Sequence, residues 1–191
     1  MPSVRSFNFY KNTCLKKSRT KRKRFPILFA ACLFFLAPST AQIQEKESNV
    51  KAAFIYNFTK YIEWDTNNGD EFVIGIIGTS PIYQPLSDIA ATKTVQNKRI
   101  VIRQVNKPEE IANCDILFIS ANSSFPLSSI FANTHRGTLL ISETPGYANM
   151  GTALNFIVEH DKLKFEANLK SISDEGLKAS SQLLKLATIV N

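Results

Sequence analysis

Apolar positions along residues 50–62 recur at the three- and four-residue spacing of a helix. Ser48 or Asn49 is suited to cap the N-terminus of this helix. Polar residues at 66–70 predict a turn directly after it. The apolar positions of the helix are Val50, Ala53, Phe54, Phe58, Tyr61 and Ile62. We therefore expect an amphipathic helix that ends near Trp64.

Four later apolar runs are too short for ordinary helices and are rich in β-branched residues, which predicts buried strands. Helical features separate these runs, beginning with Pro81 and an apolar face of Leu86, Ile89 and Ala90. Short helical pieces are expected at 108–111 and 126–132. The predicted strands are 72–78, 100–105, 116–120 and 138–142. This alternation predicts an α/β fold with βαβ units and a mainly parallel sheet.

The pattern changes after residue 151. Two strand-like segments, 154–158 and 163–167, are separated by only four residues, which favours an antiparallel β-hairpin. Asn168 can cap a long C-terminal helix, within which Gly176 marks a break or a point of close packing. The apolar face of this helix would consist of Leu177, Leu183, Leu184, Leu186, Ala187 and Val190.

The N-terminal segment has the order of a secretory signal peptide. A basic stretch at 16–24 precedes an apolar run at 26–37, and small residues follow at Ser39 and Ala41. We expect residues 1–41 to be a signal peptide cleaved after Ala41, which leaves residues 42–191 as a single exported domain. The alternative is an uncleaved segment that tethers the protein to the inner membrane. A bilayer span needs about 20 apolar residues, and this run is shorter.

The net charge of +7 belongs to the leader. Residues 1–41 hold nine of the 23 basic residues and none of the 16 acidic ones, so the remainder is near −2. A strongly basic domain would suggest nucleic acid as a partner. This chain, without its leader, is not basic, so we predict no nucleic-acid partner.

One cysteine, Cys114, lies outside the leader, since Cys14 and Cys32 precede residue 41. A lone thiol forms no internal disulfide, although an oxidising compartment would permit one. Its place at the head of an apolar run favours a buried small hydrophobic side chain over a reactive thiol. An intermolecular disulfide is the remaining alternative.

Catalytic constellations are lacking in the sequence. Neither His135 nor His160 has a partner at metal-ligand spacing, and both fall in predicted loops. There is no Gly-x-Ser-x-Gly motif. The sequence therefore predicts no enzyme, no metal and no cofactor.

Two loops are candidate binding sites. Gly75 to Ser80 joins a strand to a helix, where a glycine turn either holds a phosphate or serves only packing and turn geometry. Ser142 to Gly151 follows the fourth strand, and ligands of open α/β sheets collect at such carboxyl ends. The candidate ligand pocket consists of Gly78, Thr79 and Thr144. The candidate partner or dimer surface consists of Pro145, Gly146, Tyr147 and Met150, unless Tyr147 packs inward.

Residues 50–64 resemble the opening helix of the YfiR family of periplasmic proteins. Segments 72–78, 114–120, 142–156, 163–170 and 176–187 resemble the family's later blocks in order. The resemblance implies a three-layer α/β/α sandwich, often dimeric, that is not an enzyme. It further implies binding to the periplasmic sensor region of a membrane diguanylate cyclase of the YfiN type. That cyclase would be repressed, which lowers cyclic di-GMP and disfavours biofilm.

Two alternatives to cyclase control stay open. Other members of the family look suited to different receptors, including histidine kinases, and a periplasmic small-molecule-binding protein is a separate hypothesis. One departure concerns disulfides, which the best-described members use. Cys114 fits the family's cysteine at a strand start, but Tyr147, Ala148 and Asn155 occupy the region where another bridge is expected. Redox gating by an internal disulfide is therefore not expected.

Overall fold

The computed structural model describes residues 40–64 and 69–190. The expected signal peptide lies outside these residues, except for Thr40 and Ala41, which begin the first helix. In the described ranges, no helix is both long and apolar enough to cross a bilayer.

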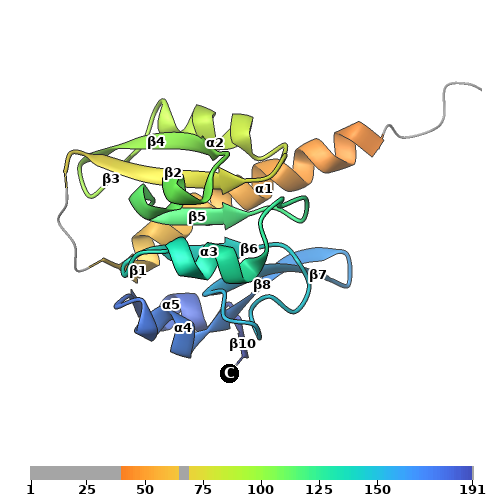
Figure 1. Cartoon of the computed structure of the whole chain (residues 1–191). Coiled ribbons are helices and arrows are strands. Elements are labelled where there is room, and N and C mark those ends of the chain that lie inside the picture. The colour runs from red at the N-terminus through yellow and green to blue at the C-terminus, as the bar shows by residue number, and fades with distance from the viewer. Residues whose placement is uncertain (1–39, 65–68, 191) are drawn as a thin grey trace, which may run out of the picture. The chain divides into compact units, whose positions relative to one another are not determined.

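Eight strands form one sheet in the order β10-β8-β7-β6-β5-β2-β4-β3 (Figure 1). Five strands from β4 to β7 across the sheet run parallel, and β10 is parallel to β8. Within this sheet of the described residues, only β3–β4 and β7–β8 pair antiparallel. The strands are β2 (Glu71–Ile77), β3 (Thr94–Val95), β4 (Lys98–Val105), β5 (Ile116–Ile119), β6 (Leu139–Ser142), β7 (Leu154–Glu159), β8 (Lys162–Asn168) and β10 (Thr188–Val190). The predicted parallel sheet and hairpin are confirmed.

Helices cover both faces of this sheet. Helices α1 (Thr40–Tyr61) and α2 (Tyr83–Ala90) pack on one face through side chains such as Ile55 and Leu86. The 3₁₀ helix η2 (Pro108–Asn113) and α3 (Leu127–Asn133) pack on the other through Ile111 and Ile130. The domain is therefore the expected three-layer α/β/α sandwich.

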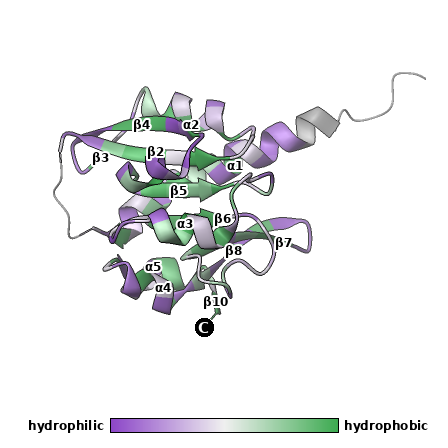
Figure 2. Cartoon of the chain, in the orientation of Figure 1, coloured by the Kyte–Doolittle hydropathy of each residue, from purple (hydrophilic) through white to green (hydrophobic). Residues whose placement is uncertain are grey.

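The helices on both faces of the sheet explain why the strand sequences are apolar. Successive residues of β2 contribute to opposite cores: Phe72 and Ile74 to the α1 side, and Val73 and Ile77 to the α3 side. Because neither face meets water, the strands are apolar throughout rather than alternating. Figure 2 shows hydrophobic strands at the centre and hydrophilic residues toward the N-terminal end of α1.

The first helix differs from its prediction in start and orientation. It begins at Thr40, so Ser48 is not a cap, and its hydroxyl donates to the Glu45 carbonyl inside the helix. Ala52 and Ile55 are buried, whereas Val50 is 39% exposed. The buried stripe runs back from Phe58 through Ile55 and Ala52, whereas the predicted stripe ran back through Phe54, Ala53 and Val50. Ala53 is accordingly exposed rather than inward-facing.

The long C-terminal helix predicted after Asn168 is wrong. The segment contains α4 (Leu169–Asp174), β9 (Lys178–Ala179), α5 (Ser181–Leu184) and then β10. Gly176 has a φ of +76°, a left-handed conformation that ends a helix. Strand β9 pairs with β1 (Ile62–Glu63), and the Ser180 side chain caps α5. Leu186, expected in an apolar face, is 68% exposed.

The turn between β7 and β8 holds two non-glycine residues in a backbone conformation that lowers stability. His160 and Asp161 have φ values of +52° and +57°, the paired left-handed conformation that favours asparagine and glycine. We expect Asp161→Gly to raise the free energy of unfolding by about 1 kcal/mol, because glycine adopts this φ without steric cost. Urea unfolding measures the change. Asp161→Ala should give no gain, and a loss of stability in the glycine variant would contradict the assigned turn.

Candidate functional site

A cavity of about 300 Å³ lies at the carboxyl ends of β2, β5 and β6. The chain leaves β2 toward β4 on one side and later returns to β5 on the other. Such a reversal of strand order is where open α/β sheets bind ligands. The cavity is lined by Gln44, Glu47, Ser48, Lys51, Thr79, Ser80, Pro81, Ile82, Ser120, Ala121, Asn122 and Glu143.

The loops after β2 and β5 meet closely beside this cavity. Gly78 has a φ of +83°, and a β-carbon added to it would lie 2.7 Å from the Asn122 carbonyl oxygen. The Ser120 hydroxyl donates to the Thr79 carbonyl at 3.2 Å. Gln104 of β4 donates to the Gly78 carbonyl at 3.0 Å. The cavity wall is thus built from backbone fixed by three neighbouring strands.

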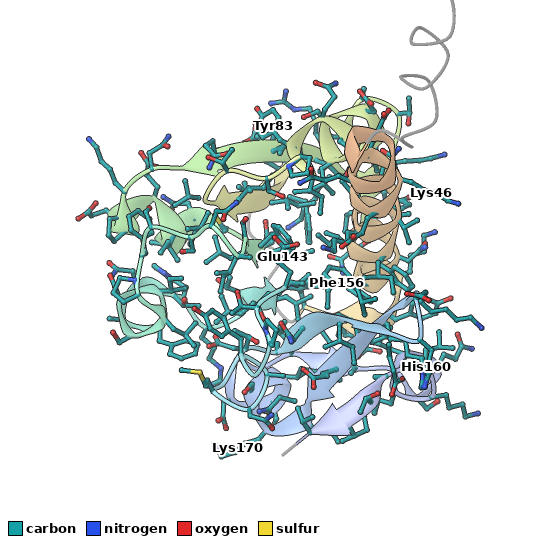
Figure 3. The ribbon with its side chains drawn as sticks, turned by 90° about the vertical axis from the view of Figure 1, so that its right-hand side faces the viewer. Lys46, Tyr83, Glu143, Phe156, His160 and Lys170 are labelled. Carbon is teal, nitrogen blue, oxygen red and sulfur yellow. The ribbon has the colours of Figure 1, made fainter. Side chains whose placement is uncertain are left out.

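The charged part of the cavity comes from α1 and from the end of β6. The Lys51 ammonium lies 2.7 Å from a Glu143 carboxylate oxygen and 2.6 Å from a Glu47 oxygen. The other Glu143 oxygen accepts the Ala121 N–H at 3.0 Å. Figure 3 shows Glu143 among the interior side chains, whereas Lys46, on the same helix α1 as Lys51, points outward.

Burial and ion pairing act in opposite directions on Lys51. Burial lowers the pKa of its ammonium, but the hydrogen bonds and charges of Glu143 and Glu47 outweigh that effect and raise the pKa above its usual value. The side chains of Lys51 and Glu143 are only 14% and 15% exposed. Lys51 is therefore a fixed cation at neutral pH.

The predicted pocket residues lie near this cavity in different ways. Thr79 lines it, whereas Gly78 shapes the adjoining turn and Thr144 is half-buried beyond Glu143. The sequence reading missed Lys51, Glu47 and Glu143. Glu143 carried a usable signal, because it directly follows a parallel strand. Lys51 carried none, since the orientation of α1 does not follow from its own apolar pattern.

The predicted partner surface is a compact loop after β6. Pro145 and Gly146 are exposed, and Met150 is 60% exposed. Tyr147 is half-buried and packs against the core between the sheet and α3. Beside Met150, a β-carbon added at Gly151 would lie 3.1 Å from the Phe131 ring, itself 37% exposed. Phe131 therefore lies next to this loop at Gly151, and both Phe131 and Met150 expose apolar side chains.

This loop is held from below by buried polar groups. Asn168 donates from its side-chain amide to the Ala148 carbonyl at 2.8 Å. Ser142 at the end of β6 lies 2.9 Å from the Thr152 hydroxyl and 2.6 Å from the Asn155 amide oxygen. Asn155 in turn donates to Glu166 at 2.9 Å. These buried hydrogen bonds fix the backbone from which the exposed loop residues project.

Cys114 is a buried thiol in the second core, as the sequence favoured. A β-carbon on Gly75 would lie 2.6 Å from its sulfur, so Gly75 serves close packing. Burial raises the pKa of Cys114 from 9.0 to about 11. A thiol is a nucleophile only as thiolate, so this site is unreactive at neutral pH.

We expect iodoacetamide to modify native Cys114 at least about 100-fold more slowly than in the urea-unfolded chain, since two pKa units remove 99% of the thiolate near pH 8. Peptide mass spectrometry separates this residue from Cys14 and Cys32. The raised pKa also contributes stability below pH 9 that is lost as pH rises toward 11. Equal native and unfolded rates would contradict the buried position.

A second, larger cavity of about 480 Å³ lies at the amino ends of the strands and includes His135. Three of its charged groups make contacts within the fold. Arg103 pairs with Glu71 at 3.3 Å. Asp115 accepts the Val73 N–H at 2.6 Å, and burial raises the pKa of its carboxyl. Across the described ranges 40–64 and 69–190, no three metal-ligating side chains gather.

The order of the strands defines a doubly wound α/β domain, and the polar cavity lies at its strand switch point. The sequence profile of the YfiR/HmsC-like family matches residues 48–188, so the chain belongs to this family. Proteins of this family are generally periplasmic regulators, so membership indicates a regulatory protein. The predicted family resemblance is confirmed.

Among solved structures, the chain is similar to a conserved domain protein from Vibrio cholerae O1 biovar El Tor, with a TM-score of 0.53 and 10% identity. The match covers 75% of this chain and 60% of that protein's length, and it concerns the fold alone. No curated protein matches the sequence significantly.

Proposed function

We propose that the protein is an exported, non-enzymatic regulator that binds the periplasmic sensor region of a membrane signalling protein. The target we favour is a diguanylate cyclase, whose repression would lower cyclic di-GMP. The observation that carries this proposal is the match of the YfiR/HmsC-like profile over residues 48–188. A histidine kinase or another receptor is the alternative partner.

The loop after β6 is our candidate for the contact surface. Met150 and Phe131 expose apolar area, and Pro145 with Gly146 leaves the backbone accessible. Exposed apolar side chains on a fixed base are typical of interaction sites. Repression needs only different affinities for two receptor states, and about 1.4 kcal/mol of difference shifts their ratio tenfold.

The first experiment measures cellular cyclic di-GMP in the source organism with and without this gene. We expect a rise on deletion that is reversed by expression of the exported protein. An unchanged level would contradict cyclase repression. Co-purification of the tagged protein with solubilised membranes would then identify a different receptor.

Substitution at the loop tests the surface itself. We expect Met150→Glu to restore high cyclic di-GMP while the purified variant stays folded, because a charge would be buried in the contact. The matched control is Val158→Glu on the β7–β8 hairpin, where Val158 is 64% exposed. Equal effects of both variants, or normal repression by Met150→Glu, would place the contact elsewhere.

A further inference from the structure

The cavity at the switch point has a defined charge. Its charged lining residues are Glu47, Lys51 and Glu143, which gives two carboxylates against one ammonium. The Lys51 charge is already shared between both carboxylates at 2.6 and 2.7 Å. The net charge of −1 in a partly closed space attracts cations and repels anions.

The Glu47 and Glu143 carboxylates are acceptors that keep hydrogen-bonding capacity in this cavity. The Ser120 hydroxyl donates to Thr79 and accepts the Asn122 N–H, and the Ser80 hydroxyl accepts the Ile82 N–H at 3.4 Å. The Ser120 hydroxyl and the backbone amides of Asn122 and Ile82 therefore have partners. Carboxylate oxygens accept several hydrogen bonds each. Each Glu143 oxygen holds one contact, and one Glu47 oxygen holds the contact with Lys51.

From this geometry we propose that the cavity binds a small organic molecule that carries a protonated amine. The amine donates hydrogen bonds to the unused lone pairs of the Glu47 and Glu143 carboxylate oxygens, next to Lys51. A volume of about 300 Å³ lies at the lower end of the range for small-molecule sites. The position at the carboxyl ends of β2, β5 and β6 is the one at which this class of sheet binds ligands.

The site is connected to the loop surface through one residue. Glu143 lines the cavity and begins the loop that carries Pro145, Gly146 and Met150. Its carboxylate joins α1, the β5 loop and β6 through Lys51 and Ala121. An amine that donates hydrogen bonds to Glu143 changes the contacts at the base of that loop. This regulatory link rests on the proposed function, whereas ligand binding does not.

The test uses protein produced from the full-length gene and two probes of equal length and opposite charge. Thermal unfolding and the Ala121 amide NMR signal are followed during titration with 1,4-diaminobutane or succinate at matched ionic strength. We expect the diamine to raise the melting temperature saturably and to shift the Ala121 signal, and succinate to do neither. Equal effects of both probes, or no effect of the diamine, would overturn the proposal.

Variants locate the site. Glu143→Gln keeps an oxygen for the Ala121 N–H but removes one charge, so we expect diamine affinity to fall at least about tenfold. Glu159→Gln on the distant hairpin is the matched control and should bind normally. Glu47→Gln provides a second variant at a more exposed residue, in case Glu143→Gln does not fold. Unchanged affinity in the folded cavity variants would overturn the proposal.

The two proposals fail separately. Diamine binding with unchanged cyclic di-GMP on gene deletion supports the cavity and contradicts cyclase repression. A rise in cyclic di-GMP without diamine binding does the reverse. If both hold, the diamine should change cyclic di-GMP in cells with the native protein but not in cells with Glu143→Gln.

Discussion

Gly78→Ala is expected to lower the free energy of unfolding by about 3 kcal/mol. The added β-carbon would lie 2.7 Å from the Asn122 carbonyl oxygen and 2.9 Å from the Ser123 nitrogen. Both are backbone atoms of the loop after β5, so neither can rotate away as a side chain would. Overpacking of this kind costs about 1–3 kcal/mol, and the φ of +83° adds about 1 kcal/mol for an L-residue.

Gly146→Ala is the matched control. Gly146 has nearly the same φ, +85°, but no atom lies within 4 Å of an added β-carbon. Its cost should therefore be the conformational part alone, about 1 kcal/mol. Urea unfolding monitored by circular dichroism compares the two variants. If both lose the same stability, the loops after β2 and β5 do not meet as described, and the cavity wall beside them is wrong.

The central sheet was predictable because its strands are buried on both faces. The runs at β2, β5 and β6 are short and continuously apolar, and helical segments separate them along the chain. Such an order leaves few topologies other than a parallel sheet covered by helices. The hairpin β7–β8 was equally clear, since its short connection allows only an antiparallel return.

The edges of the fold were not predictable in the same way. Strands β9 and β10 are two and three residues long and owe their conformation to pairing with β1 and β8. Local leucine spacing in 183–187 mimicked a continuous helix. Gly176 and Ser180 were signals of a break, because one ends α4 and the other caps α5. Pairing partners distant in sequence overrode the local pattern.

The candidate cavity was predictable in place but not in composition. The rule for carboxyl strand ends led to the loops at Thr79 and Thr144, close to the cavity. Lys51 and Glu47 reach it from α1, whose buried stripe is set by contacts with the aromatic cluster around Phe58. If helix α1 were turned about its axis so that the buried stripe moved by one residue, different polar side chains would face inward. Sequence spacing alone does not fix such a rotation.

Asn168→Ala is expected to lower the free energy of unfolding by about 2 kcal/mol through two losses. The Asn168 side-chain oxygen accepts the Ser171 N–H at 2.9 Å and so caps α4, a contact worth about 1 kcal/mol. Its amide also donates to the Ala148 carbonyl at 2.8 Å, and the side chain is 5% exposed. The Ala148 carbonyl still accepts the Gly151 N–H at 3.2 Å, so loss of this second, buried hydrogen bond costs about 1 kcal/mol more.

Ser180→Ala separates these two contributions. The Ser180 side chain also caps a helix, accepting the Leu183 N–H at 3.3 Å, but it supports no loop. Its removal should cost only about 1 kcal/mol. Urea unfolding of both variants gives the comparison, and equal losses would mean that the contact with Ala148 contributes nothing. Because Ala148 lies between Tyr147 and Met150, Asn168→Ala should also weaken repression at temperatures where the variant stays folded, whereas Ser180→Ala should not.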